Sequence, residues 1–385
     1  MKYFKTIILG SGASGVMCGL SIKNKKDVAI IDKNAKLAKK ILVTGNGRCN
    51  LTNLHIFKNS YNQDVTPFIN RFNQNDLLAF FSSLGLMTYA DEEGRVYPIS
   101  NSAKSVVDVL TNALNKTEIN QIFNENILKI EKKNDIFEIL TENNSYSCKN
   151  LVVCLGGKSC ELLDKNFKLS ISPLTPSLVS LKANVSRSLA GVRVNARVYL
   201  INEKGEQSQK ETGEVLFREN GLSGICIFNQ SAFLARNKDF NGEIFLNLMP
   251  NFNEEEIKNI LKERRNLNIQ VSSFFDGMFA KELGWEILTR SKVNEQKQSI
   301  LLSDDEIKRF CQIIKHLNFK IKGYLENNQV FSGGIKLDSL NENLMSKSTN
   351  NLYFCGEGVD VDGLCGGYNL QWAFTSGKIV GENLW

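Results

Sequence analysis

Six residues near the start of the chain carry the first chemical signal. Residues 10–15 read GSGASG, which is the G-x-G-x-x-G spacing of a dinucleotide-binding loop. In such a loop Gly10 permits a tight turn, Gly12 lets a pyrophosphate approach the main chain, and Gly15 lets a helix pack closely on a strand. Asp32 lies where a carboxylate accepts hydrogen bonds from ribose hydroxyls. The alternative is a tight turn in an ordinary loop.

The elements around this loop decide between the two interpretations. A short apolar run, Thr6 to Leu9, is typical of a buried parallel strand, and apolar residues at helical spacing follow the glycines. A second apolar run, DVAIID, ends at Asp32. Strand, glycine loop, helix and strand in this order are the context that the fingerprint requires. We therefore predict a Rossmann-type dinucleotide site with the phosphates at the N-terminus of the helix.

The C-terminal part of the chain repeats this order of strand, glycine turn and helix. The predicted strand, Leu352 to Cys355, is closed by Gly356-Glu357, Asp360 and Asp362 lie in the turn, and Gly366-Gly367 precedes an apolar-faced helix. In many flavoproteins such an acid binds the ribityl chain, and the helix N-terminus faces the flavin pyrimidine ring, where its dipole stabilises the reduced anion. The alternative is a C-terminal helix with a glycine-rich cap. Two glycine clusters and two acids favour FAD over NAD.

A polar stretch at residues 39–53, KKILVTGNGRCNLTN, has few apolar residues to bury and many hydrogen-bond donors. It begins shortly after Asp32, so we expect it to lie over the dinucleotide. The N–H groups of its glycine turn, Arg48, and the amides of Asn50 and Asn53 are predicted to bind phosphate, ribityl and flavin oxygens. Lys40 adds positive charge.

The composition excludes several other classes of protein. The chain has 385 residues, 42% hydrophobic and 23% charged, which is ordinary for a globular protein of two or three domains. Its 47 basic and 41 acidic residues are spread along the chain without a Lys/Arg block, so no nucleic-acid partner is expected. Nine cysteines without a C-x-x-C pair and only two histidines argue against a disulfide scaffold and predict no metal site. No apolar run is long enough to span a membrane, so we predict no membrane partner and a cytoplasmic protein.

The middle of the chain changes from one periodicity to another. Residues 173–250 alternate apolar and polar residues as half-buried strands do. Residues 251–318 have helical spacing, with a capping box that begins at Ser303. A part made of β-strands and a helical part are therefore expected between the two glycine motifs.

Two shorter stretches add candidate residues. The apolar run VVCLGG predicts a buried strand that ends at Gly156 and Gly157, beside the dinucleotide. The segment GRVYPIS predicts a hairpin, in which Tyr97 has a structural role and Arg95 stays open as a substrate or phosphate contact.

Five segments together resemble one family, the BaiN/RdsA flavoproteins, also called the YhiN family. They are KKILVTGNGRCNLTN, EEGRVYPISNSAKSVVDVL, GEVLFRENGLSG, FSGGI and GEGVDVDGLCGGYNLQWAF. The resemblance implies an α/β fold with a Rossmann-type FAD-binding domain, residues 1–172 and 328–385. An insert interrupts this domain and consists of a small β-barrel, residues 173–250, and a helical subdomain, residues 251–327.

The resemblance and the motifs together define a set of expected FAD-binding residues. No catalytic residue is assigned, because Lys, Glu, Tyr or a substrate amine stay open as the general acid or base. The expected cofactor-binding residues are Gly10, Gly12, Ser14, Gly15, Asp32, Lys33, Lys40, Thr44, Gly45, Gly47, Arg48, Cys49, Asn50, Gly156, Gly157, Gly356, Glu357, Asp360, Gly366, Gly367, Asn369, Leu370 and Gln371.

The chain departs from the family pattern at two positions. Ile225 stands where the family usually has proline, and this change is expected to loosen a loop of the insert. Cys365 stands where threonine is usual and places a thiol near the flavin. A redox pair of Cys49 and Cys365 is conceivable, but we predict that neither cysteine is catalytic.

The predicted function is that of an FAD-dependent oxidoreductase, resembling aminoacetone oxidases or reductases of conjugated bile-acid enones. Flavin N5 is expected to exchange a hydride with a small organic substrate. The partner is O₂ or a transiently docked NAD(P)H, because no second complete fingerprint is visible. The alternatives are a flavoprotein that acts on or binds RNA or a protein partner, and an NAD-only dehydrogenase. The oligomeric state stays open.

Overall fold

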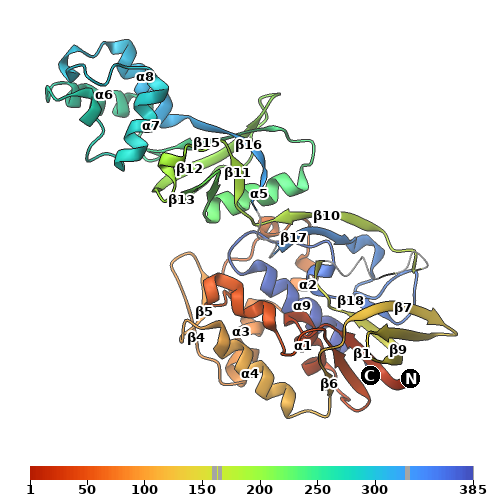
Figure 1. Ribbon diagram of the computed structural model, residues 1–385. Coiled ribbons are helices and arrows are strands. Elements are labelled where there is room, and N and C mark those ends of the chain that lie inside the picture. The colour runs from red at the N-terminus through yellow and green to blue at the C-terminus, as the bar shows by residue number, and fades with distance from the viewer. Residues whose placement is uncertain (158–162, 164–166, 326–329, 385) are drawn as a thin grey trace. The chain divides into compact units, whose positions relative to one another are not determined.

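The computed structural model divides the chain into two compact units, each with a hydrophobic core of its own (Figure 1). It describes residues 1–157, 163, 167–325 and 330–384. Unit 1 consists of Met1–Thr175 and Val330–Trp385, and unit 2 consists of Pro176–Gln329. Because both chain ends belong to unit 1, unit 2 is an insertion in its sequence.

A mostly parallel sheet forms the centre of unit 1. Its strand order is β6-β2-β1-β9-β8-β7, and β18 pairs with β9 as well. Strands β6, β2, β1, β9 and β18 run parallel, whereas β8 and β7 form an antiparallel hairpin at one side. The strands of unit 1 are β1 (Lys2–Leu9), β2 (Val28–Ile31), β3 (Thr52–Asn53), β4 (Thr88–Ala90), β5 (Arg95–Pro98), β6 (Asn120–Ile122), β7 (Ile127–Lys133), β8 (Ile136–Thr141), β9 (Ser145–Val153), β10 (Ile171–Ser177), β17 (Val330–Ile335) and β18 (Leu352–Phe354).

The register of this sheet places four motifs at one edge. The last residues of β1, β2, β9 and β18 lie side by side in the parallel ladders. The next residues of these strands are Gly10, Asp32, Cys154 and Cys355, so the loops that follow them start at the same level. Ligands of parallel α/β sheets bind at this carboxyl edge.

The first strand is longer than the predicted Thr6 to Leu9. Its additional residues begin at Lys2 and pair with Tyr146 to Cys148 of β9. They alternate between exposed and buried positions, so their apolar content is too low to predict a strand. A partner more than a hundred positions away in the sequence therefore decides where the strand begins.

Two helices of unit 1, α1 and α9, pack closely on one another. Figure 1 shows α1 and α9 side by side. A Cβ atom at Gly377 of α9 would overlap the carbonyl oxygen of Ser14, and one at Gly381 would overlap that of Cys18, so the main chains touch without side chains between them. The helices of unit 1 are α1 (Ala13–Ser21), α2 (Thr66–Ile69), α3 (Gln74–Ser83), α4 (Ala103–Asn115) and α9 (Tyr368–Glu382).

Two small sheets complete unit 1. Strands β3, β5 and β4 form an antiparallel sheet, in which Tyr89 of β4 lies opposite Tyr97 of β5. The hairpin predicted around Tyr97 is confirmed. Strands β10 and β17 pair as the second small sheet.

Unit 2 contains a closed barrel with strand order β11-β14-β13-β12-β15-β16. Its last strand, Leu317–Tyr324, pairs with both β15 and β11 and closes the barrel. This strand lies outside the range 173–250 expected for the barrel and inside the range 251–327 expected to be helical. The sequence analysis missed it because its partners lie before the helices and the closing contact is long-range. The strands are β11 (Leu181–Ala183), β12 (Arg193–Asn202), β13 (Glu211–Arg218), β14 (Gly221–Ser223), β15 (Gly242–Asn247) and β16 (Leu317–Tyr324).

A helix lies within the range expected to be β. Ile225 is the first residue of α5, a position that also suits proline. A Cβ atom at Gly224 would overlap the carbonyl oxygen of Glu214, so the main chain before α5 is held against β13. Ile225 therefore begins a helix, and the expectation that it loosens a loop of the insert stays a prediction.

The other helices of unit 2 match the predicted helical spacing. The capping box at Ser303 is confirmed, because Ser303 Oγ accepts from Glu306 N–H and the Glu306 carboxylate accepts from Ser303 N–H. No helix among the described residues is long and apolar enough to cross a membrane. The helices are α5 (Ile225–Arg236), α6 (Glu254–Arg265), α7 (Lys281–Ser291) and α8 (Asp304–Lys315).

The contact between α1 and α9 gives a test of the fold. We expect Gly377→Ala to lower the free energy of unfolding by about 2 kcal/mol, because the methyl group must push a main-chain carbonyl aside. Gly12→Ala is the matched control, since a Cβ atom there meets nothing within 4 Å. The free energy of unfolding of Gly12→Ala should differ from that of the wild type by no more than about 1 kcal/mol, which is the cost of alanine at a helix N-cap. Urea denaturation measures both, and equal losses would contradict the packing described.

Candidate cofactor site

The fingerprint loop is packed tightly at its first and third glycines and open at its second. Gly10 has a φ of +98°, and a Cβ atom there would lie 2.5 Å from the carbonyl oxygen of Cys154. A Cβ atom at Gly15 would overlap the carbonyl oxygen of Gly10. At Gly12 it would meet nothing within 4 Å. The main chain at the start of α1 therefore faces open space, as a pyrophosphate requires.

Asp32 joins the fingerprint loop to the end of β2. Its Oδ2 accepts from the main-chain N–H and the hydroxyl of Ser11, both at 2.7 Å. Its Oδ1 accepts from the main-chain N–H and the side-chain amide of Asn34 at 2.8 and 2.9 Å. Lys33, the next residue, is exposed.

The C-terminal motif meets the fingerprint at Gly356. A Cβ atom at Gly356, which has a φ of +70°, would lie 2.6 Å from Ser14 Oγ. Ser376 Oγ accepts from Gly356 N–H at 2.8 Å, and the indole N–H of Trp372 donates to Gly356 O at 3.1 Å. Helix α9 thus holds this turn against α1.

The carboxylate of Glu357 brings three further segments together. Its Oε2 is paired with Lys40 Nζ at 2.6 Å, and its Oε1 accepts from Phe331 N–H at 3.0 Å. A Cβ atom at Gly156 would lie 3.3 Å from Oε2. Gly157 instead packs on the ring of Phe331, with 3.1 Å between its Cβ position and the ring. Gly157 is therefore explained by packing alone.

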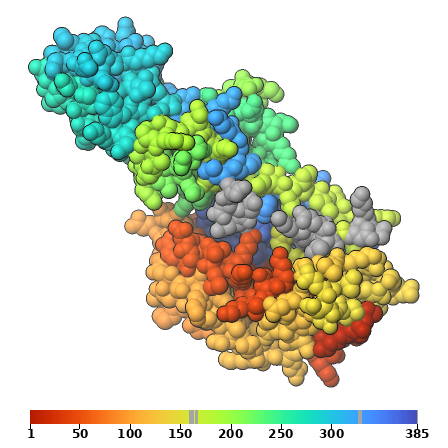
Figure 2. Space-filling view, viewed as in Figure 1, coloured from red at the N-terminus to blue at the C-terminus, as the bar shows by residue number. Residues whose placement is uncertain are grey.

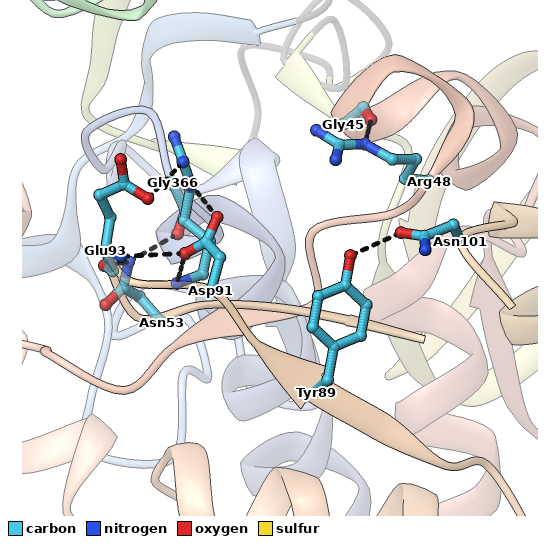
Figure 3. A network of polar contacts seen from close by, with 9 residues as sticks. Gly45, Arg48, Asn53, Tyr89, Asp91, Glu93, Asn101 and Gly366 are labelled. Atoms are coloured by element: carbon cyan, nitrogen blue, oxygen red, sulfur yellow. Dashed lines mark hydrogen bonds and ion pairs between the residues drawn. The ribbon is translucent and has the colours of Figure 1, made fainter. Parts of the chain in front are cut away.

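The polar stretch over residues 39–53 divides into an exposed first part and a buried second part. Residues 45–48 are exposed and belong to the orange-red surface of unit 1 in Figure 2. Thr44 Oγ1 donates to Ile41 O at 2.7 Å. Arg48 Nε donates to Gly45 O at 3.4 Å (Figure 3). Its guanidinium carbon lies 4.5 Å from the ring centre of Tyr97.

The buried second part connects to the start of α9. Thr52 Oγ1 donates to Gln371 Oε1 at 2.6 Å. Asn53 Nδ2 donates to the carbonyl oxygens of Gly366 at 3.2 Å and Glu93 at 3.3 Å (Figure 3). Gly367 has a φ of +101°, and a Cβ atom there would overlap Thr52 O. Strand β3 and the glycine turn before α9 therefore fit together through their main chains.

One buried atom at this junction has no protein partner. Asn50 Oδ1 accepts no hydrogen bond from any residue that the structure describes. Neighbouring side chains of α9 are occupied: Asn369 exchanges two hydrogen bonds with the main chain of Gly363, and Gln371 donates to Phe72 O. Leu370 packs at the margin of the core.

The acidic residues of the C-terminal turn are held by nearby polar groups. Asp360 is half-buried and accepts from Asn62 Nδ2 at 3.3 Å. Asp362 is buried and accepts from Ser332 Oγ at 3.2 Å. Asp360 is therefore the more accessible of the two for a ribityl chain.

Arg95, which the sequence leaves open as a substrate or phosphate contact, is already engaged by two carboxylates. Its guanidinium is paired with Asp91 and with Glu93, both at 2.7 Å. Tyr97, which the sequence analysis treated as structural, is buried in the hairpin, and burial raises the pKa of its phenol. Its contact with Arg48 gives it a place in the site that no sequence motif indicates.

Cys49 and Cys365, which the sequence makes conceivable as a redox pair, are both present as thiols. Burial raises the pKa of Cys49 to about 12, so this residue is a neutral thiol at physiological pH. Cys365 is half-buried. Cys154 and Cys355 lie instead with their sulfur atoms 2.9 Å apart, and burial raises the pKa of Cys154 well above its usual value.

These features define a Rossmann-type α/β protein whose glycine motifs meet at the carboxyl edge of a parallel sheet. The chain belongs to the family described as HI0933-like protein Rossmann domain, which it matches over residues 4–383. The family resemblance drawn from the sequence motifs is confirmed. FAD is the cofactor of this family, and the open main chain at Gly12 and the orphaned Asn50 Oδ1 fit such a group.

Two relatives and one solved structure show what the chain is similar to. The 3-dehydro-bile acid delta(4,6)-reductase of Clostridium scindens is 27% identical over 97% of both chains. The ribosomal RNA dihydrouridine synthase of Escherichia coli is 26% identical over all of this chain and 98% of its own. A flavocytochrome c3 fumarate reductase in its open conformation matches 99% of this chain and 78% of its own, with a TM-score of 0.49 and 14% identity.

The raised pKa of Cys49 makes stability depend on pH. The thiol ionises near pH 9 in the unfolded chain but near pH 12 in the folded one. Its contribution is therefore complete below pH 9 and is lost as the pH rises toward 12, at about 1.4 kcal/mol per pH unit. We expect the stability of Cys49→Ala to fall less steeply above pH 9 than that of the wild type. Urea denaturation from pH 8 to 10.5 measures this, and parallel slopes would show that folding does not raise the pKa of Cys49.

Proposed function

We propose that this protein is an FAD-dependent oxidoreductase that reduces a carbon–carbon double bond conjugated to a carbonyl group in a small organic substrate. The observation that supports the proposal most is that three motifs lie together at one edge of the sheet. They are the fingerprint, the polar stretch and the C-terminal glycine turn. The two relatives support it, because a delta(4,6)-reductase and a dihydrouridine synthase both saturate such a double bond.

In this proposal the chain binds and orients the cofactor through its main chain. The start of α1 at Gly12 holds the pyrophosphate, Asp32 orients the ribose, and Asp360 contacts the ribityl chain. The start of α9 supplies N–H groups and a helix dipole that favour negative charge. Bound FAD would supply the hydride chemistry at N5, and NAD(P)H would supply the two electrons that the reduction consumes.

Reduction of a conjugated double bond also consumes a proton. Tyr97 is a candidate donor, because its ring lies beside Arg48 and beside the glycine turn at Gly45. Burial raises the pKa of its phenol and weakens it as an acid, so transfer of its proton requires stabilisation of the phenolate. Arg48 lies over its ring and can stabilise negative charge that develops nearby. Cys49 is excluded as a nucleophile in this scheme, because it stays a neutral thiol.

Action on RNA is the second candidate function. It is favoured by the dihydrouridine synthase of Escherichia coli and by its namesake from Haemophilus influenzae, which is 25% identical over 97% of both chains. The distribution of charge favours a small substrate, since the net charge of +6 arises from interspersed acids and bases. Both functions use the same reduction and differ in what carries the double bond.

The substrate class is tested by anaerobic reoxidation of the reduced flavoprotein. We expect a 4,6-dien-3-one steroid to restore the oxidised flavin spectrum and bulk ribosomal RNA to leave it reduced. An electrophoretic shift with the same RNA at physiological salt is the companion measurement. Reoxidation by RNA together with a shift would replace the small-molecule substrate by RNA. If neither probe reacts, the double-bond reduction is wrong.

The domain division is also a proposal. We propose that residues 1–172 and 328–385 form the cofactor domain, and that residues 173–327 form an insert of a barrel and a helical part. Separate hydrophobic cores in the two units support this division.

Two variants are expected to give opposite results. Replacing residues 173–329 by a short linker should leave FAD bound and abolish turnover, because the glycine motifs all lie outside the insert. Gly12→Val should lose FAD, because its side chain fills the open space over the main chain at the start of α1. Chromatography of the chromophore released by heat measures both. FMN in the wild type, or full FAD occupancy in Gly12→Val, would contradict the assignment.

A further inference from the structure

Asn50 and the start of α9 together form a small polar site. Some of its hydrogen-bonding groups have no partner among the described residues. The Asn50 side chain is 9% exposed, and its Oδ1 has no hydrogen-bond donor among those residues. A buried acceptor without a donor is costly, and few persist in native proteins without a ligand or water. The unpaired, buried Asn50 Oδ1 therefore indicates a ligand that donates a hydrogen bond to it.

The neighbouring helix start supplies donors. The first hydrogen bond within α9 is donated by Gln371 N–H to Gly367 O. The N–H groups of Asn369 and Leu370 precede this bond, and no acceptor among the described residues takes either of them. A Cβ atom at Gly367 would lie 2.8 Å from Asn50 Oδ1, so the acceptor stands directly at the cap of the helix.

An acceptor beside main-chain donors recognises a group that has an N–H next to a carbonyl. A cyclic imide has this edge, and it occurs both in the pyrimidine ring of the flavin and in uracil. We propose that Asn50 Oδ1 accepts the hydrogen bond of the imide N–H of FAD, while the start of α9 donates to the adjacent carbonyl oxygen. This inference rests on the proposed function.

The position of the pair in the fold favours the flavin over a uracil substrate. Asn50 follows the loop that lies against the fingerprint segment, where Ala38 N–H donates to Ser11 O. Asn50 is buried, and Thr52 anchors the adjoining strand to Gln371. A fixed and buried acceptor suits a resident cofactor better than a substrate that must enter and leave. Asn50 is then a positioning residue that fixes the orientation of the flavin ring.

The test compares FAD with its N3-methyl analogue, which lacks the imide N–H. We expect the wild-type apoprotein to bind FAD about tenfold more tightly than N3-methyl-FAD, the size of one buried hydrogen bond. Asn50→Ala should bind the two with nearly equal affinity. Asn150→Ala is the matched control, because Asn150 is equally buried but its side chain donates to Thr6 Oγ1 in the central sheet, and it should keep the wild-type ratio. Fluorescence titration measures all six dissociation constants.

Two further measurements separate the outcomes. Asn50→Asp keeps the acceptor, so it should retain the preference for FAD but lower the midpoint potential, because a carboxylate repels the reduced flavin anion. Apo Asn50→Ala should unfold at no lower temperature than the wild type, whereas a purely structural role would make it less stable.

The inference is overturned if Asn50→Ala keeps the tenfold preference or if the wild type shows none. It is also overturned if uridine, but not 3-methyluridine, competes at the site in the wild type only, which would assign Oδ1 to a uracil. Failure of the wild type to bind FAD at all would instead contradict the proposed function.

Discussion

Direct contact between main chains is the constraint on which the rest of unit 1 depends. The turn at Gly10 touches the carbonyl oxygen of Cys154, directly after β9, and Gly377 touches the carbonyl oxygen of Ser14. Gly356 lies against the side chain of the same serine. Side chains at these points would hold the segments apart. Because they are absent, the starts of α1 and α9 come to the same edge of the sheet, where their N–H groups and dipoles favour negative charge.

Polar side chains then lock the loops around this edge. Asp32 ties the fingerprint loop to the second strand through Ser11 and Asn34, and Glu357 ties the C-terminal turn to Lys40 and Phe331. Each carboxylate is thus part of the scaffold as well as a candidate ligand. The ion pair of Glu357 is partly exposed, so its value is in orientation more than in stability.

The site has few groups capable of proton chemistry, which suits a reaction in which the cofactor does most of the work. Burial keeps Cys49 and Tyr97 protonated, and Asp91 and Glu93 neutralise Arg95. Of the charged groups in the polar stretch, Lys40 is paired with Glu357, whereas Arg48 lies over the ring of Tyr97. Chemistry at this site therefore depends on position and electrostatics.

The sequence by itself determined the local elements of the cofactor site. The fingerprint, the two flanking strands and the C-terminal glycine turn were predictable because each depends on residues close in the chain. So were the capping box at Ser303 and the hairpin around Tyr97, which depend on turn and cap chemistry.

Only the tertiary structure decided which of these residues are already engaged by other parts of the protein. Gly157 packs on Phe331, Asn369 holds the turn at Gly363, and Arg95 is neutralised, although all three share the residue types of a binding site. The closing strand of the barrel and the helix that starts at Ile225 were missed for the same reason. Their positions depend on partners far away in the sequence, and the free energy of those contacts is not encoded in any local pattern.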